Sequence, residues 1–218
     1  MRPLALPPGP LNVLCLGAHP DDIEIGCGGT LLALAETRTL KVTWIVFSGS
    51  PARAAEARAS AAKLLGASAK VDARVEGFRD GYFPAESAAI KDAFEKLKSG
   101  PAPDLVFTHT IEDRHQDHRL LAELTWNTFR DHLVLEYEIP KYDGDLGRPS
   151  VYVPLSPAVC ERKVQHLLDA FPSQREKRWF RRETFLALLH LRGVEAGAAE
   201  GAAEAFYGRK IVFRDSRP

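Results

Sequence analysis

The chain has 218 residues, of which 45% are hydrophobic and 27% charged, as in an ordinary globular protein, so we expect one domain over 1–218 with a flexible tail at 1–10. Its 29 basic and 29 acidic side chains balance, which argues against nucleic acid or an anionic membrane as a partner. No apolar run is long enough to span a bilayer, and no signal peptide is recognisable. The three cysteines include no CxxC pair, which argues against a disulfide framework. Together these features predict a cytoplasmic protein.

Strand and helix patterns alternate over the first 130 residues. Continuous apolar runs, typical of strands buried on both faces, predict strands at 11–18, 42–48 and 104–110. A weaker extended segment is expected at 71–75, so that 104–110 is the fourth predicted strand. Apolar residues at helical spacing predict helices at 29–36, 53–65, 84–98 and 119–129. This alternation predicts an α/β fold in which a mostly parallel sheet is covered by helices on both faces.

The rest of the chain follows a different pattern. "LVLEYEI" and "VYVPLS" predict extended segments at 133–139 and 151–156, and helices are expected around 160–171 and 185–189. The stretch 195–205, rich in Ala, Gly and Glu, is expected to be a surface loop or a short helix, and "YGRKIVF" (207–213) a final strand.

Ionisable side chains follow the first predicted strand. His19, Asp21 and Asp22 come directly after it, and the glycine-rich "GCGG" lies at 26–29. A dinucleotide-binding loop needs GxGxxG immediately after the strand, and two carboxylates would repel the pyrophosphate. A nucleotide loop is therefore a poor interpretation of this stretch, and we expect the glycines to allow a tight turn and a close approach of helix to sheet.

A metal site explains the cluster better. His19 and Asp22 are three residues apart, so one turn of chain brings both to the same side, and an imidazole with a carboxylate suits Zn²⁺. A catalytic zinc site takes three protein ligands. The third could be either His115 or His118, in the "HQDH" that follows the fourth predicted strand. The histidine that is not a ligand would face the substrate, and Asp21 would accept a proton from the attacking water.

The sequence suggests, without deciding, roles for three further features. His109 ends the fourth predicted strand beside the site, where it is a candidate for orienting a ligand. The basic and aromatic stretch 174–183 is expected to be a solvated helix start with a buried aromatic anchor, although it could also bind an anionic part of a substrate. Tyr142 lies in a loop that could face the substrate.

At these residues the sequence resembles the LmbE-like, or PIG-L, family of zinc-dependent N-acetylglucosamine deacetylases. "AHPDDIEIGCGGTL" (18–31) is similar to the first family motif and "EDRHQDH" (112–118) to the second. A weaker similarity extends to 53–67 and, in the last third, to 173–174 and 203–206. Gln116 stands where the family usually has Pro, which leaves the ionisable side chains of the motif unchanged.

The resemblance implies a Rossmann-like three-layer sandwich with Zn²⁺ as cofactor, and it implies roles for single residues. The implied zinc ligands are His19, Asp22 and His118. Asp21 would be the general base, and His115 would polarise the scissile carbonyl or protonate the departing amine. Asp117 would orient a histidine, and Arg53 would contact the substrate.

These roles imply an amidohydrolase that removes the acetyl group from an N-acetylglucosamine-type sugar or glycoconjugate and releases acetate. Its partner would be a small N-acetylated sugar or glycoside, and the family resemblance also implies a homo-oligomer, a trimer or a hexamer. The alternative function is a Rossmann-like module that binds a nucleotide or a phosphosugar without catalysis. Nucleotide affinity that does not depend on metal would identify that alternative.

Overall fold

The computed structural model describes residue 6 and residues 8–212, so most of the predicted tail and the end of the last predicted strand lie outside the described residues. Within them, one sheet has the strand order β3-β2-β1-β4-β5-β7-β6. The strands are β1 (Leu11–Gly17), β2 (Leu40–Ser48), β3 (Ala69–Phe78), β4 (Leu105–His109), β5 (Val134–Tyr137), β6 (Val151–Pro154) and β7 (Ala203–Tyr207). The division into a single domain stays a prediction.

The sheet is mostly parallel, as predicted. Strands β1 to β5 pair in parallel, and only β7 runs antiparallel to its neighbours β5 and β6. The chain adds β2 and β3 on one side of β1 and then crosses to place β4 on the other side. The strand order therefore reverses between β1 and β4, and in such sheets ligands bind beyond the carboxyl ends of the strands at this point.

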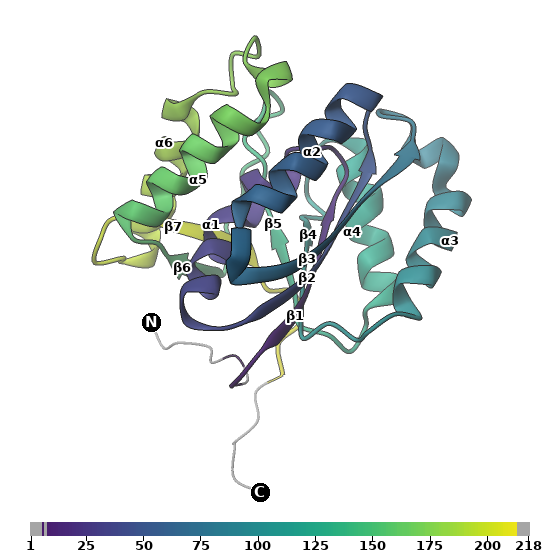
Figure 1. Cartoon of the computed structure of the whole chain (residues 1–218), viewed down its shortest axis with the longest axis horizontal. Coiled ribbons are helices and arrows are strands. Elements are labelled where there is room, and N and C mark those ends of the chain that lie inside the picture. The colour runs from purple at the N-terminus through teal and green to yellow at the C-terminus, as the bar shows by residue number, and fades with distance from the viewer. Residues whose placement is uncertain (1–5, 7, 213–218) are drawn as a thin grey trace, which may run out of the picture.

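Helices cover both faces of the sheet, so the fold is a three-layer α/β sandwich (Figure 1). The helices are α1 (Asp22–Thr37), α2 (Pro51–Leu64), α3 (Ser87–Lys98), α4 (Gln116–Thr128), α5 (Pro157–Ala170) and α6 (Arg182–Ala196), with short 3₁₀ turns at Gly66–Ser68, Phe83–Glu86 and Pro172–Gln174. Helices α1, α2, α5 and α6 pack on one face, and α3 and α4 on the other.

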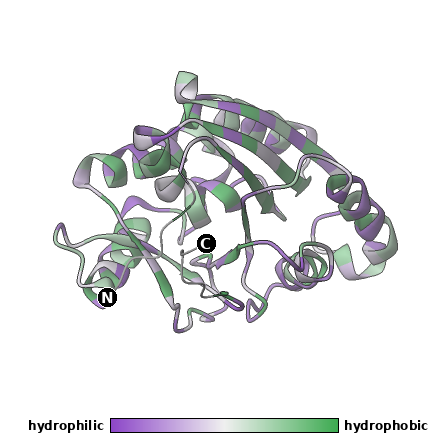
Figure 2. Cartoon of the chain, turned by 90° about the horizontal axis from the view of Figure 1, so that it is seen from below, coloured by the Kyte–Doolittle hydropathy of each residue, from purple (hydrophilic) through white to green (hydrophobic). Residues whose placement is uncertain are grey.

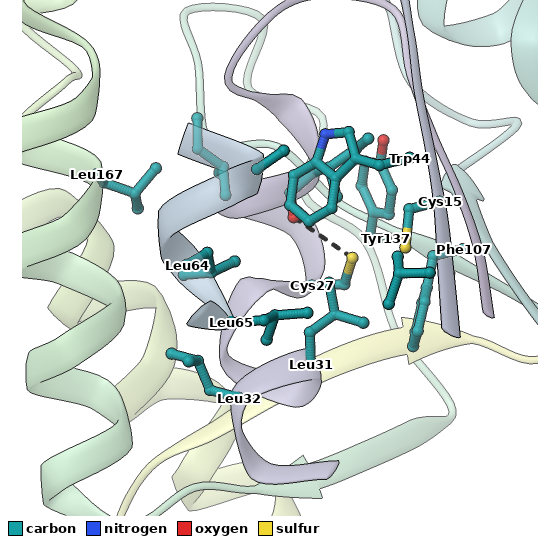
Figure 3. Close-up of a cluster of buried hydrophobic side chains, with 14 of the residues drawn as sticks. Cys15, Cys27, Leu31, Leu32, Trp44, Leu64, Leu65, Phe107, Tyr137 and Leu167 are labelled. Atoms are coloured by element: carbon teal, nitrogen blue, oxygen red, sulfur yellow. Dashed lines mark hydrogen bonds between the residues drawn. The ribbon is translucent and has the colours of Figure 1, made fainter. Parts of the chain in front are cut away.

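A separate hydrophobic cluster fills each of the two spaces between helices and sheet. Figure 2 shows hydrophobic and hydrophilic residues alternating along the helices, as expected when one side of each helix packs on the sheet. The cysteines belong to this interior: Cys15 and Cys27 lie among Trp44, Phe107 and Tyr137 (Figure 3). All three cysteines are buried and free, so they pack as small hydrophobic residues and form no disulfide.

Helix α1 begins seven residues before the predicted start, because the low helix propensity of its glycines hides its first two turns. These glycines allow close packing. A Cβ on Gly26 would lie 2.3 Å from Cδ2 of Tyr137, and a Cβ on Gly29 would lie 2.6 Å from Leu155 and 2.8 Å from Glu204. Gly26 and Gly29 thus serve helix packing inside the fold, as expected, and do not form a phosphate loop.

A buried ion pair reaches the middle of α1. The carboxylate of Glu204 on β7 accepts hydrogen bonds from the backbone N–H groups of Gly29 and Thr30, at 2.7 and 2.6 Å. The ammonium of Lys163 donates to that carboxylate at 2.5 Å and to the carbonyl of Ile25 at 2.6 Å. These contacts join α1, α5 and β7 at the centre of the face that carries most of the core.

The predicted loop or short helix at 195–205 is wrong at its end, because β7 begins at Ala203. The alanines of β7 pack inside the fold, since Ala203 is 0% and Ala205 5% exposed. Small side chains in this strand therefore reflect tight packing rather than a surface loop. The predicted strand at 207–213 is also wrong: β7 ends at Tyr207, and residues 208–212 form no strand.

Candidate metal centre and active site

The two predicted His/Asp clusters meet at the switch point, beyond the ends of β1 and β4. The loop after β1 is held by two neighbouring strands: the N–H of Ala18 donates to Nε2 of His109 at 3.0 Å, and the carbonyl of Ala18 accepts from Ser48. Helix α1 then begins at Asp22, one residue after Asp21. The second cluster lies on the first turn of α4.

The three implied zinc ligands point at one position. Nδ1 of His19 lies 3.0 Å from Nε2 of His118 and 3.4 Å from Oδ2 of Asp22, and the remaining pair is 3.6 Å apart. Ligand atoms arranged tetrahedrally around zinc, at the usual bond lengths, lie about 3.3 Å from one another. The side chains are buried, and two imidazoles with one carboxylate are a donor set typical of catalytic zinc sites. These residues fit a zinc ion.

Carboxylates on the outer side fix the orientation of both imidazoles. Nδ1 of His118 lies 2.8 Å from Oδ2 of Asp113, and Nε2 of His19 lies 3.4 Å from Oδ2 of Asp117 and 3.1 Å from the exposed Asp80. Asp117 thus contacts a histidine, in line with the orienting role expected of it, and its own carboxylate accepts from two backbone N–H groups. Such partners direct the inner nitrogen of each ring toward the metal.

Sequence reasoning missed Asp113 and Asp80. Asp113 is 1% exposed and is the carboxylate that holds His118. It lies inside the "EDRHQDH" motif, five residues before that histidine, which is the one signal that could have found it. Asp80 follows β3 in a loop that shows no pattern in the sequence.

The electrostatics of the cluster suit a cation. Burial lowers the pKa of His118 to about 3 and leaves it neutral, with a lone pair available. Burial alone would raise the pKa of Asp22, but His118, His109 and His19 hold it well below its usual value. Burial alone would lower the pKa of His19, yet the Asp22 carboxylate and its other acidic partners raise it well above its usual value. One positive charge is therefore stabilised where a metal ion would lie.

Asp21 lies beside the metal position and is free for chemistry. It occupies the N-cap of α1, but its carboxylate accepts no capping hydrogen bond from the helix backbone. Its Oδ1 accepts from Nη2 of Arg53 at 2.7 Å, whereas its buried Oδ2 has no hydrogen-bond partner among the described residues. Burial raises the pKa of Asp21, and the Arg53 guanidinium opposes part of that shift. A buried carboxylate with a raised pKa is what a general base needs.

His115 packs against His19 and His118, two of the implied ligands. It is the N-cap of α4, and its Nδ1 accepts from the N–H of Asp117 at 3.3 Å, which in the neutral ring leaves the proton on Nε2. Its ring centroid is 4.8 Å from that of His19 and 4.7 Å from that of His118. Burial, followed by the charge of His19, lowers the pKa of His115.

His109 packs against His118 and Asp22. It is fully buried, its ring stacks on His118 with 3.8 Å between centroids, and its Nε2 lies 3.2 Å from Oδ2 of Asp22. The hydroxyl of Tyr137 reaches the same nitrogen at 3.3 Å and donates to the carbonyl of Leu16 at 2.6 Å. His109 therefore packs against two of the implied ligands, the placement expected of an orienting residue.

A cavity of about 250 Å³ opens over the cluster. Its floor carries His19, Asp21, Asp22, His115 and His118, and its rim is formed by Arg53, Asp80, Ile139, Lys141, Tyr142, Asp143, Lys177 and Trp179. Arg53, expected to contact the substrate, thus lines the cavity while it also holds Asp21. Within the stretch 174–183, Phe180 is the buried aromatic anchor, at 2% exposure, but α6 begins only at Arg182.

None of the helices in the described part of the chain is long and apolar enough to cross a membrane.

Comparison with known proteins relates this chain to deacetylases. Residues 14–129, more than half of the chain, match the family described as PIG-L, GlcNAc-PI de-N-acetylase. The uncharacterized deacetylase YaiS of Escherichia coli K12 is 29% identical in an alignment of 141 positions, which covers 59% of this chain and 74% of YaiS.

Solved structures share the fold. The conserved protein TT1542 of Thermus thermophilus superposes with a TM-score of 0.69 and 24% identity over 95% of this chain and all of TT1542. The zinc-inhibited form of the teicoplanin deacetylase Orf2 superposes with a TM-score of 0.64 and 16% identity, over 90% of this chain and 97% of Orf2.

Proposed function

The chain belongs to the PIG-L family of GlcNAc-PI de-N-acetylase, and from this membership we propose that it is a zinc-dependent hydrolase that removes the acetyl group from an N-acetylglucosamine-type sugar or glycoconjugate. The observation that carries the proposal is the convergence of the three ligand atoms, 3.0 to 3.6 Å apart, on the floor of the cavity that Asp21 and His115 also line. Membership of the family supports a deacetylase role. The proposal adds that the enzyme needs zinc and that it acts on an N-acetylated sugar.

His19, Asp22 and His118 would hold the zinc, which when bound polarises the acetyl carbonyl and makes the attacking water more acidic. Asp21 takes a proton from that water on Oδ2, since Arg53 occupies Oδ1. The water oxygen forms a bond to the carbonyl carbon, and the carbon–nitrogen bond then breaks. One water is consumed, and acetate and a free amine are released.

His115 assists the reaction at the carbonyl oxygen. Its Nδ1 is held by the backbone of α4, so Nε2 carries the proton and can donate it into the cavity. Its Nε2–H donates a hydrogen bond to the carbonyl oxygen as negative charge develops there. The proton that Asp21 took from the water then passes to the amine as the carbon–nitrogen bond breaks, which returns Asp21 to its carboxylate form. Asp113 and Asp117 take no part in bond making; they hold the rings of His118 and His19.

The site does not favour the alternative of a nucleotide-binding module without catalysis. Asp21 and Asp22 occupy the place beyond β1 where a pyrophosphate would bind, and the glycines of α1 face Tyr137, Leu155 and Glu204. The cytoplasmic location and the trimer or hexamer stay predictions of the sequence.

The proposal is tested by metal content and acetate release in three variants. The zinc-loaded protein is expected to carry one zinc per chain and to release acetate from an N-acetylglucosamine glycoside. His118→Ala is expected to lose both the zinc and the activity. Asp21→Asn is expected to keep the zinc but to lower kcat by about 10²–10⁴-fold. His166→Ala, a change of a histidine remote from the cavity, is the matched control and is expected to keep both.

Full zinc content in His118→Ala would contradict the ligand assignment, and unchanged turnover in Asp21→Asn would remove Asp21 as the base. Absence of acetate release from every N-acetylated sugar by the zinc-loaded protein would contradict the proposed reaction.

A further inference from the structure

The two edges of the sheet differ in what they offer to another strand. At one edge, β6 has only four residues and ends in Pro154, which has no backbone N–H to donate. At the other edge, β3 has ten residues without a proline, and within the described part of the chain it pairs only with β2. The backbone N–H and C=O groups on the outer side of β3 can therefore pair with a further strand.

The side chains of β3 separate into an apolar and a charged face, because successive side chains of a strand point to opposite sides. Val71, Ala73 and Val75 are half-buried on the face against which α2 packs. The other face carries charges that alternate in sign along the strand: Lys70, Asp72, Arg74 and Glu76. β3 keeps a regular register with β2 from Ala69 to Val75, so the centre of this series lies on an undistorted strand.

The central two charges of the series are accessible. The side chains of Asp72 and Arg74 are each 55% exposed, and Arg74 donates a hydrogen bond to Asp72 within the strand. This hydrogen bond, followed by the charges of Asp72 and Glu76, raises the pKa of Arg74. An exposed pair of this kind contributes little to stability, so both side chains remain available to a partner.

The charge series of β3 is complementary to itself in one arrangement. When two copies of β3 lie antiparallel with Ala73 opposite Ala73, each Asp72 faces the Arg74 of the other copy, and each Lys70 faces its Glu76. On the apolar face, Val71 then faces Val75. Opposite charges and β-branched residues directly across from each other stabilise antiparallel strands.

Other arrangements of the same two strands are disfavoured. A shift of the register by two residues places Asp72 opposite Asp72 and Lys70 opposite Arg74, so that like charges meet. A shift by one residue joins the charged face of one copy to the apolar face of the other. A strand with charges of one sign would repel its own copy in every register, whereas the alternation in β3 selects a single one.

We propose that β3 is a contact between two copies of this chain, which pair antiparallel about a two-fold axis at Ala73 and join their sheets into one. Such a contact is closed, because the same residues of both copies contribute to it. A trimer has no two-fold axis, so the contact fits a dimer or the hexamer rather than the trimer expected from the sequence. The inference does not depend on the proposed zinc or on the reaction.

The test measures the particle mass of the full-length protein by sedimentation equilibrium over a dilution series. The parent is expected to form a dimer or a hexamer. Asp72→Lys alone and Arg74→Glu alone each place like charges opposite one another at two positions of the contact, and each is expected to halve the particle mass. The double variant Asp72→Lys/Arg74→Glu restores opposite charges at both positions and is expected to recover the parent mass.

The two single variants are also complementary to each other, although each repels its own copy. An equimolar mixture of Asp72→Lys with Arg74→Glu is therefore expected to recover the parent mass. Arg178→Glu is the matched control, because it makes the same charge reversal at an exposed arginine outside β3, and it is expected to keep the parent mass. Far-UV circular dichroism of each variant verifies that the reversals leave the fold intact.

A parent that is monomeric at every concentration would overturn the inference, as would the parent mass in both single variants. Half the parent mass in the double variant and in the mixture would also overturn it, because the contact would then not place Asp72 opposite Arg74. None of these outcomes involves acetate release, so failure of the inference and failure of the proposed deacetylase activity are distinguishable.

Discussion

Two glycines of the same helix should respond in opposite directions to alanine. A Cβ on Gly26 would lie 2.3 Å from Cδ2 and 2.4 Å from Cγ of Tyr137, distances that real Cβ contacts do not reach. The Tyr137 ring cannot yield easily, because it is 0% exposed and its hydroxyl is bonded to Leu16 at 2.6 Å. By contrast, a Cβ on Gly28 would meet its nearest atoms at 3.8 to 3.9 Å, which is ordinary contact.

The magnitudes follow from these distances. Overpacking a core position costs about 1–3 kcal/mol, and the clash at Gly26 belongs at the upper end. Replacing a helical glycine by alanine returns about 1 kcal/mol. Gly26→Ala should therefore lower the free energy of unfolding by about 2 kcal/mol, and Gly28→Ala should raise it by up to about 1 kcal/mol.

Equilibrium urea unfolding of both variants with chelator present measures this difference without a contribution from bound metal. The midpoint of Gly26→Ala is expected to fall by about 1 M, and that of Gly28→Ala to stay or rise. Because Tyr137 also contacts His109, Gly26→Ala should weaken zinc binding as well. A Gly26→Ala protein as stable as the parent, or an equal loss in Gly28→Ala, would refute the packing argument.

Three other changes test a contact of the candidate metal site, a buried ion pair and a helix cap. Asp113→Asn should weaken zinc binding about 10–100-fold, measured by competition with a chelating dye. Glu112→Gln should not, because Asp113, and not its neighbour Glu112, contacts the ring of His118. Lys163→Met should lower the free energy of unfolding by about 3–5 kcal/mol, since it leaves the charge of Glu204 buried and unpaired. In urea unfolding, the double variant with Glu204→Gln should recover part of this loss. No recovery in the double variant would contradict the charge argument. Ser50→Ala removes the hydroxyl that accepts from a backbone N–H at the start of α2 and should cost about 1 kcal/mol in thermal unfolding; an unchanged midpoint would show that this cap contributes nothing.

The parallel half of the fold could be predicted because its strands are continuous apolar runs and its helices are amphipathic. Strands β1, β2 and β4 appear close to where the sequence places them. The helix expected at 53–65 is found as α2, and Gly66, which follows it, has a positive φ of +52°, as glycines after a helix often do. The start of α1 was not visible, because glycines chosen for close packing look like a loop.

The site was predictable only in part for a related reason. His19, Asp22 and His118 follow strands at recognisable spacings, and parallel strands bring their carboxyl ends to one edge. Asp113, Asp80 and the rim residues reach the site through loops whose shape no periodicity encodes. β7 was missed because its buried small side chains, such as Ala203, resemble a low-complexity surface segment.

The most direct test of the account is the position of zinc in a crystal, located by anomalous scattering at the zinc absorption edge. The account predicts a peak about 2.0–2.1 Å from Nδ1 of His19, Nε2 of His118 and a carboxylate oxygen of Asp22, with the cavity side left open. The chain offers another grouping, in which the ligand atoms of His19, His115, Asp80 and Asp117 also lie within 4.8 Å of one another. Zinc centred in that grouping, or no peak at the floor of the cavity, would contradict it.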